Sequence, residues 1–176
     1  KLGYVTQKAV LFSGTVEDNV FFGQSAAEKT DASLQAALSL SQAAEFVDKY
    51  PEKAAHPIAQ LGRNVSGGQK QRLSIARALA RKPEILIFDD SFSALDYKTD
   101  AVLREGLAKQ LPGTTKIIVA QRISTIRNAD QILVLDRGEI AGLGTHDELM
   151  VSCPVYREIA MSQLSEEELK KGGVSK

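Results

Sequence analysis

Four consecutive apolar residues followed by two acids constrain the fold of this chain most. The run Ile-Leu-Ile-Phe at 85–88 leads directly into Asp89 and Asp90. A continuous apolar strand, rather than an alternating one, is typical of a parallel sheet that helices cover on both faces. From residue 85 onward, strand-sized apolar runs at 117–120 and 132–135 alternate with helical patterns. The sequence therefore predicts an α/β fold with a mostly parallel sheet and right-handed crossovers.

Charge balance and cysteine count exclude several classes of protein. The 176 residues carry 22 basic and 22 acidic side chains, a net charge of zero. Nucleic-acid binding starts from excess positive charge, so nucleic acid is not an expected partner. No apolar run approaches the roughly 20 residues that span a bilayer. The single cysteine, Cys153, cannot form an internal disulfide.

The remaining patterns divide the chain into four parts. Residues 1–7 are expected to end a core strand, and 8–82 to form an inserted helical subdomain that finishes with a helix over 67–80. Residues 83–160 carry the alternating strands and helices of the core, and 161–176 are expected to form an exposed terminal helix or tail. The sequence thus predicts one α/β core with a helical insertion near its N-terminal end.

Two local signals predict the structure of the last third of the chain. The turn Arg-Gly at 137–138 separates two expected strands, 132–136 and 139–143, a pattern that favours a β-hairpin. Thr145 and Glu148 then have the spacing of a capping box, which favours a helix.

Ser66, Gly67, Gly68 and Gln69 predict an anion site at the start of a helix. Ser66 and Gln69 have the spacing of a capping box. Glycine costs about 1 kcal/mol relative to alanine in a helix, so two glycines in the first turn need a reason. Two bare amides at the positive end of a helix let a phosphate approach closely. A plain glycine-rich turn before a helix is the alternative that these four residues leave open.

Asp89 and Asp90 predict a metal site. A carboxylate at the C-terminal edge of a parallel strand lies where nucleotides and their magnesium ions bind. An acidic turn without a ligand is the alternative. The sequence Ser-Ala-Leu-Asp follows at 93–96. Three features therefore occur in a specific order: the helix start at 66–69, the strand that ends in two acids at 85–90, and this segment.

These motifs together resemble those of the ATP-binding cassette (ABC) ATPases. The matching segments are the signature motif at 66–72, the Walker B strand at 85–90, the D-loop at 93–96, the Q-loop at 4–7, an exporter-type segment at 11–19 and a C-terminal motif at 144–149. The resemblance covers most of residues 2–160 and rests on motifs in the family's order.

The resemblance implies a role for each matched residue. Asp89 would hold magnesium, and Gln7 would sense both magnesium and the attacking water. The signature residues 66–69 would bind an ATP held by the opposite subunit, with the first three at its γ-phosphate. Asp96 would reach across the dimer interface. ATP and Mg²⁺ are the implied cofactors, because phosphoryl transfer needs cradled phosphates, a metal and a positioned water.

The resemblance also implies a fold and partners. The fold is a P-loop NTPase-type sheet, mostly parallel, with an inserted α-helical subdomain. The activity is ATP hydrolysis coupled to transport across a membrane. The partners are a second nucleotide-binding domain and a transmembrane domain fused upstream, which places the chain at the cytoplasmic face of the cell membrane.

Three features depart from the family pattern. The phosphate-loop motif Gly-x-x-x-x-Gly-Lys-Ser/Thr is absent. We interpret this as truncation before Lys1, which removes the phosphate-loop strand and leaves the fragment inactive alone. Asp90 stands in place of the usual glutamate base, and a displacement of about 1 Å at a reacting centre can cost roughly 100-fold in rate. Gln121 stands in place of the switch histidine and carries no titratable proton. His56 and His146 are expected to be structural.

The distribution of these departures suggests a hypothesis. Asp90 and Gln121, which serve the chain's own ATP, are altered, whereas residues 66–69, which serve a partner's ATP, are intact. We therefore expect a heterodimer in which this chain completes the partner's site while its own site is degenerate. The alternatives are a soluble ABC-type ATPase of the chromosome or DNA-repair kind and an ATP-binding regulatory module. Neutral charge and the exporter-type segment count against the soluble ATPase.

Overall fold

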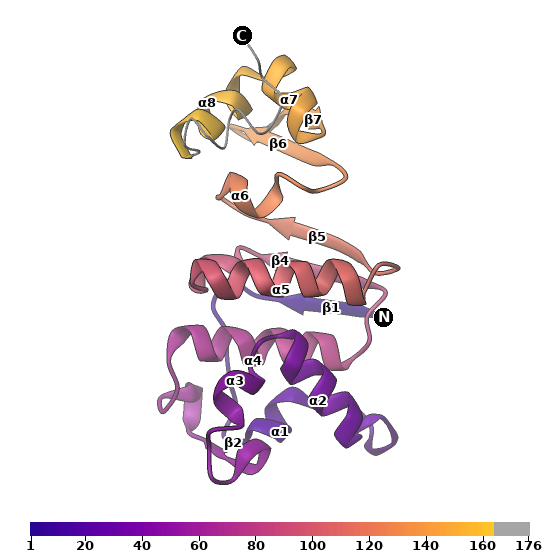
Figure 1. Cartoon of the computed structure of the whole chain (residues 1–176), viewed down its shortest axis with the longest axis vertical. Coiled ribbons are helices and arrows are strands. Elements are labelled where there is room, and N and C mark those ends of the chain that lie inside the picture. The colour runs from indigo at the N-terminus through magenta and orange to yellow at the C-terminus, as the bar shows by residue number, and fades with distance from the viewer. Residues whose placement is uncertain (164–176) are drawn as a thin grey trace. The chain divides into compact units, whose positions relative to one another are not determined.

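The computed structural model describes residues 1–163 and divides the chain into two compact units (Figure 1). The first unit comprises residues 1–119, and the second begins at Ala120. Each unit has its own hydrophobic core. Among residues 1–163, no helix has the length and apolar content of a membrane span. Residues 164–176, most of the expected terminal helix or tail, lie outside the described residues.

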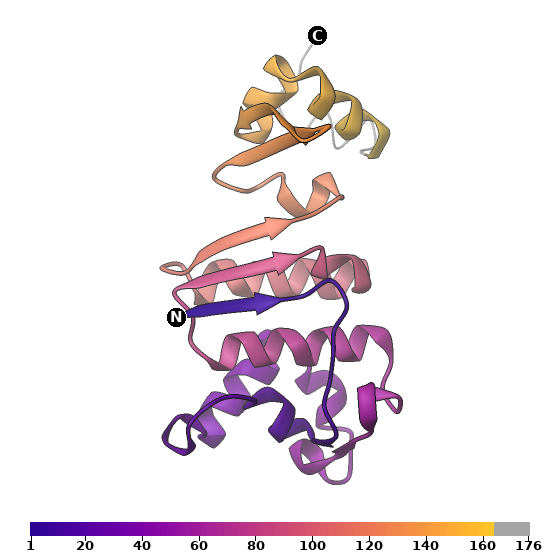
Figure 2. The same cartoon turned by 180° about the vertical axis from the view of Figure 1, so that it is seen from behind.

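A three-stranded parallel sheet is the centre of the first unit. Strands β1 (Leu2–Val5), β4 (Ile85–Asp89) and β5 (Thr115–Val119) are hydrogen-bonded in the order β1-β4-β5. Figure 2 shows the three strands pointing the same way, with helix α5 (Tyr97–Gln110) behind them. The predicted α/β fold with a parallel sheet is confirmed.

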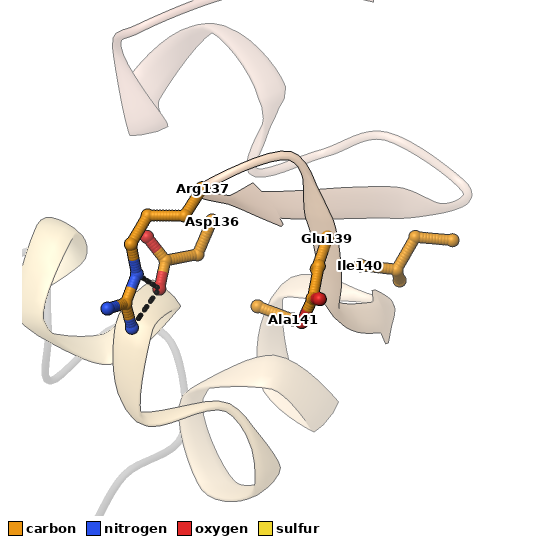
Figure 3. A pocket seen from close by; sticks show the side chains of 5 residues that line it. All are labelled: Asp136, Arg137, Glu139, Ile140 and Ala141. Carbon is orange, nitrogen blue, oxygen red and sulfur yellow. Dashed lines mark hydrogen bonds and ion pairs between the residues drawn. The ribbon is translucent and has the colours of Figure 1, made fainter.

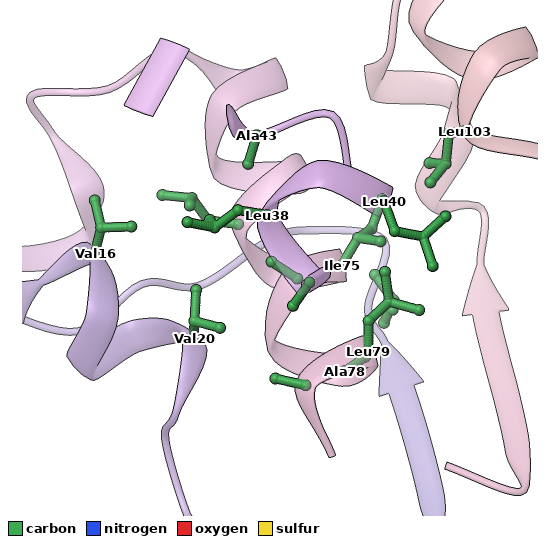
Figure 4. Packing of buried hydrophobic residues seen from close by; sticks show 14 of the residues in the cluster. Val16, Val20, Leu38, Leu40, Ala43, Ile75, Ala78, Leu79 and Leu103 are labelled. Carbon is green, nitrogen blue, oxygen red and sulfur yellow. The ribbon is translucent and has the colours of Figure 1, made fainter. Parts of the chain in front are cut away.

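Helices make up most of the remainder of the first unit. They are α1 (Val16–Val20), α2 (Asp31–Leu40), α3 (Ala44–Val47) and α4 (Gly67–Ala80), with 3₁₀ turns η1 (Ala26–Glu28), η2 (Lys53–Ala55), η3 (Gln60–Gly62) and η4 (Ser91–Ala94). The bounds of α4 are those predicted. Figure 4 shows Val20, Leu38, Ile75 and Leu79 gathered between α1, α2 and α4, where they form part of the core.

The segment before α2 contains more regular structure than its turn residues predict. Strand β2 (Gly14–Thr15) pairs with β3 (Pro57–Ile58) in an antiparallel ribbon. Helix α1 follows at once because the Thr15 hydroxyl caps the amide of Asp18 while the Asp18 carboxylate accepts from the Thr15 amide. This capping box, which the sequence carries, fixes the start of a helix only five residues long.

One face of the sheet is covered among the described residues, which corrects the prediction that both faces are. Val5, Leu86 and Phe88 are fully buried and share a core with residues of α4 and α5. On the opposite face Tyr4 is 51% exposed and Ile117 is 49% exposed. Side chains alternate along a strand, so a continuous apolar run supplies both faces whether or not both are covered. Strand β5, predicted to be buried, is an edge strand of this sheet with exposed side chains.

The second unit contains the predicted hairpin and the helices that pack on it. Strands β6 (Ile132–Asp136) and β7 (Glu139–Gly144) pair antiparallel, and their predicted bounds are confirmed to within one residue. The helices of this unit are α6 (Ile123–Ile126), α7 (His146–Ser152) and α8 (Pro154–Gln163). The capping box predicted between Thr145 and Glu148 starts α7. A side chain at residue 142 would be crowded here, because a Cβ atom would lie 2.9 Å from Leu149 Cδ2 and 3.1 Å from Cys153 Cβ.

Candidate functional site

Three of the predicted site residues meet at one edge of the parallel sheet. Gln7 follows β1 after one residue, Asp89 ends β4, and Asp90 comes next. Because β1 and β4 run parallel, both strands end at the same edge. The amide nitrogen Nε2 of Gln7 donates a hydrogen bond to Asp90 Oδ2 at 3.1 Å, although 83 residues separate them. The fold thus brings together the residues that the sequence predicts to act on a nucleotide and its metal.

Asp90 is held in an unusual backbone conformation. Its φ of 45° and ψ of 28° lie in the left-handed region, which aspartate tolerates better than most residues. Its main-chain amide donates to the carbonyl oxygen of Val119 at 3.0 Å, and its own carbonyl accepts from Ser93 Oγ at 2.7 Å. These bonds fix the turn from β4 into η4 and therefore the position of the carboxylate that meets Gln7.

Asp89 has a partner that the sequence reasoning missed. The hydroxyl of Tyr4 donates a hydrogen bond to Asp89 Oδ2 at 2.8 Å. This hydrogen bond, above all, raises the pKa of the Tyr4 phenol. Strand periodicity predicts the contact only once β1 is known to pair with β4, because Tyr4 is then in register with Ile87, which lies on the same face as Asp89. The parallel pairing of β1 with β4 was the missing fact.

The donor set at this edge fits a magnesium ion. Mg²⁺ is usually held by one or two carboxylates together with substrate phosphates and waters. Asp89 supplies a carboxylate, and Gln7 keeps its Oε1 atom as an acceptor because its Nε2 donates to Asp90. Within residues 1–163 no group of three or more His, Cys, Asp or Glu side chains could hold a metal by itself. The residues therefore suit a metal that arrives with a phosphate ligand.

The start of α4 has the predicted capping box. Ser66 Oγ accepts from the Gln69 amide at 3.2 Å, and Gln69 Oε1 accepts from the Ser66 amide at 2.8 Å. A Cβ atom added at Gly67 would meet no atom within 4 Å, and one at Gly68 would lie an ordinary 3.5 Å from the carbonyl oxygen of Ala94. Internal packing thus gives no reason for two glycines in a helical turn. This favours an external ligand over a plain glycine-rich turn.

Asp96 is the N-cap of α5, and Gln121 is the second residue of the second unit. The Asp96 carboxylate caps α5 by accepting from the Thr99 amide at 2.9 Å and the Thr99 hydroxyl at 2.7 Å, and these bonds lower its pKa. Gln121 belongs to the second unit, where its carbonyl oxygen accepts from Gln163 Nε2 at 2.8 Å.

Arg77 of α4 fastens the segment that follows Gln7, and sequence reasoning missed this too. Its Nε donates to the Asn19 carbonyl at 2.8 Å, its Nη1 to the Val10 carbonyl at 3.0 Å and its Nη2 to Asn19 Oδ1 at 2.9 Å. The guanidinium also lies 5.2 Å from the ring of Phe12, which stacks on Phe22 at 4.3 Å. Burial lowers the pKa of Arg77. The two aromatic rings are held at the surface, 43% and 51% exposed.

A hollow at the hairpin turn of the second unit is a weaker candidate. Its lining residues are Asp136, Arg137, Glu139, Ile140 and Ala141 (Figure 3). Arg137 pairs with Asp136 at 3.3 Å, but the Arg137 side chain is 91% exposed. Such an exposed pair contributes at most about 1 kcal/mol and holds no ligand by itself. The hollow contains none of the predicted site residues.

The two histidines make local contacts. His56 Nδ1 lies 3.1 Å from Glu52 Oε2, and its ring stacks on Tyr50. His146 is buried, and its Nδ1 lies 2.8 Å from the Tyr156 hydroxyl. These contacts agree with the expected structural roles.

Comparison with known proteins gives concordant matches. The family model described as "ABC transporter" matches residues 1–93. An uncharacterized ABC transporter ATP-binding protein of Bacillus subtilis is 44% identical over 167 residues, which cover 95% of this chain and 28% of that protein. Multidrug resistance protein 1 of Entamoeba histolytica is 41% identical over 170 residues, which cover 96% of this chain and 13% of that protein.

A solved structure shares the fold. The structure of a bacterial Atm1-family ABC exporter with ATP bound superposes with a TM-score of 0.88 at 36% identity, covering 94% of this chain and 29% of that one. The chain spans 27% of the length of two further curated relatives, both from Mycoplasma.

Proposed function

The chain belongs to the ABC transporter family, and on that premise we propose that it is the nucleotide-binding domain of an exporter. In this proposal it binds ATP with Mg²⁺, and hydrolysis of ATP between two such domains drives transport. The Gln7–Asp90 hydrogen bond, next to Asp89 at the end of β4, is the observation that carries the proposal. An amide and two carboxylates at this edge support the proposal, because a nucleotide is expected to bind there in a sheet of this type.

The side chains at this edge have distinct parts in the proposed reaction. Asp89 and Gln7 would hold the magnesium ion, which supplies charge stabilisation to the phosphates when bound. The Asp90 carboxylate would accept the proton of the attacking water, and the Gln7 amide would hold that carboxylate in place. An aspartate here stands one methylene farther from the water than a glutamate would, so hydrolysis at this site is expected to be slow.

The start of α4 would serve an ATP held by another domain. The main-chain amides of Gly67 and Gly68 lie at the positive end of a 14-residue helix, and the glycines leave room for an anion. We therefore propose that Ser66, Gly67 and Gly68 contact the γ-phosphate of the partner's nucleotide. Asp96 would act at the same interface.

Two altered residues support a degenerate site in this chain. Asp90 and Gln121 depart from the family pattern, whereas the residues at 66–69 match it. A heterodimer would combine one competent site, completed by this chain, with one slow site. The same two altered residues also support a purely regulatory module that binds ATP without turnover. The experiment below distinguishes the two proposals.

An exposed aromatic surface supports a partner in the membrane. Phe12 and Phe22 stack at the surface, Val10 is exposed as well, and Arg77 donates a hydrogen bond to the Val10 carbonyl. We propose that this surface contacts a transmembrane domain, and that the nucleotide-binding domain therefore works at the cytoplasmic face of the membrane. Zero net charge gives no support to a soluble ATPase that binds DNA.

A double substitution in the protein as expressed from its gene tests the proposal. Asp90→Glu with Gln121→His should raise single-turnover ATP hydrolysis by roughly 100-fold or more, because a positioned base contributes about 10²–10⁴ in rate. The exposed pair Asp48→Glu with Gln110→His makes the same chemical changes elsewhere and should leave the rate unchanged. No gain would favour the regulatory module. Fast hydrolysis by the unmodified protein expressed alone would contradict the degenerate site.

A further inference from the structure

Tyr4 lies on an exposed sheet face that carries mainly apolar side chains. Its ring is 51% exposed on β1, beside the exposed side chains of Leu2 and Ile117. Burial of the ring therefore contributes little to explain a tyrosine at this position. The specific contact of the side chain is the hydrogen bond from its hydroxyl to Asp89 Oδ2, at 2.8 Å.

The geometry of two parallel strands makes this contact depend on the length of tyrosine. Tyr4 pairs in register with Ile87, and Asp89 lies two residues farther along the same face. Such a diagonal neighbour is about 7–8 Å away between Cα atoms, which long and aromatic side chains can span. A serine or threonine hydroxyl at residue 4 would lie too far from the carboxylate.

The bond has a fixed direction. An ionised carboxylate only accepts hydrogen bonds, so the Tyr4 hydroxyl donates and Asp89 Oδ2 accepts. Within residues 1–163 the Asp89 side chain has no hydrogen-bond partner other than Tyr4, and its second carboxylate oxygen, Oδ1, has none. One oxygen is thus held while the other is available to a metal ion or to its water.

We propose that Tyr4 is a positioning residue for the metal, orienting the Asp89 carboxylate so that Oδ1 faces the magnesium ion. The inference rests on the proposed function, because it takes Asp89 as the metal-binding residue. Hydrogen-bond partners of a ligating carboxylate typically contribute 10–100-fold to metal affinity or activity. Since the ring of Tyr4 is half-exposed and water competes for the bond, we expect the lower end of that range.

The test measures metal binding rather than turnover. The protein as expressed from its gene is saturated with ATP and titrated with Mn²⁺, a magnesium substitute whose binding is read by electron paramagnetic resonance. Tyr4→Phe keeps the ring and the preference for a strand while it removes the hydroxyl. The variant should bind Mn²⁺ about tenfold more weakly, while its affinity for ATP in the presence of EDTA stays the same.

A matched control removes the same atom elsewhere. Tyr50→Phe deletes a phenol oxygen from the segment between α3 and η2, and it should leave Mn²⁺ affinity unchanged. If the partner domain is a different chain, its site should titrate normally and provide an internal reference. Melting temperatures of both variants establish that each is folded.

The outcomes separate this inference from the proposed function. Equal Mn²⁺ affinity in wild type and Tyr4→Phe would overturn the positioning role and leave the proposed function standing. An equal loss of ATP affinity with and without metal would also overturn it, because the effect would not be on the metal. Failure of the wild-type protein to bind Mn²⁺ in the presence of ATP would contradict the proposed function itself.

Discussion

The side-chain amide of Gln71 in α4 donates a hydrogen bond to the main-chain carbonyl oxygen of Thr6, 3.2 Å away and 65 residues earlier in the chain. Gln71 is 1% exposed, so this bond satisfies a polar group in the core. Thr6 precedes Gln7, whose amide reaches Asp90. Helix α4, which starts at the proposed contact with a partner's phosphate, is therefore bonded directly to the segment that carries Gln7.

Replacing Gln71 with methionine should loosen that segment. Methionine fills a similar volume but removes the hydrogen bond to the Thr6 carbonyl, and a typical bond of this kind contributes about 0.5–1.5 kcal/mol. We expect faster hydrogen exchange at the amides of Gln7 and Lys8 and slower ATP hydrolysis. Gln110→Met, at an exposed position of α5, is the control and should change neither. Unchanged exchange at both amides would show that the bond does not hold this segment.

Arg77 should not be replaceable by lysine. An ammonium group cannot reproduce the planar fork that donates to two oxygens of Asn19 and to the Val10 carbonyl. Because hydrogen bonds to charged groups contribute about 1.5–3 kcal/mol each, we expect Arg77→Lys to lower the opening free energy of α1 by roughly 2–4 kcal/mol. Hydrogen exchange of the α1 amides measures it. Arg81→Lys, at the exposed end of α4, should have little effect. Equal protection of the α1 amides from exchange in both variants would show that the Arg77 bonds do not stabilise α1.

Local signals predicted the helices well, because their causes lie within a few residues. Ser66 and Gln69 cap one end of α4 and Pro83 follows the other, so both bounds could be predicted from the sequence. The residues at the end of β4 were also found, because a buried strand ending in acids has a known place in a parallel sheet.

Contacts between distant segments could not be predicted in the same way. The bonds of Tyr4 to Asp89 and of Arg77 to Asn19 join residues 85 and 58 positions apart. Periodicity within one strand or helix does not show which strand lies next to it. The prediction that both sheet faces are covered was wrong for the same reason, because coverage depends on what packs against a face rather than on the strand itself.

A substitution at Gly67 tests whether glycine is needed there for the fold or for binding a phosphate. A Cβ atom at Gly67 meets nothing within 4 Å, and the residue has no positive φ. Gly67→Ala should therefore raise the stability of α4 by up to about 1 kcal/mol, by helix propensity. It should lower ATP hydrolysis at the partner's site, because the added methyl group occupies the space of the phosphate. Thermal unfolding and steady-state hydrolysis of the dimer measure the two effects. Unchanged hydrolysis would remove the case for a phosphate at this helix start.

The stability of the second unit should fall as the pH drops through the range where His146 titrates. Burial, and to a lesser extent the charge of Arg127, lower the pKa of His146 in the folded state below the ordinary value of 6.5. The unfolded chain therefore binds the proton more readily, so this contribution is present above pH 6.5 and is lost as the pH falls toward the folded-state pKa.

Hydrogen exchange of the α7 and α8 amides, corrected for the intrinsic effect of pH, should show easier opening at pH 5 than at pH 7.5. His146→Gln should flatten this dependence, and His56→Gln, in the first unit, should not. The Glu148 carboxylate, whose pKa is lowered by its bonds to Thr145, loses its contribution only below about pH 4.5, outside this window. A pH dependence that survives His146→Gln in full would assign the effect to another group.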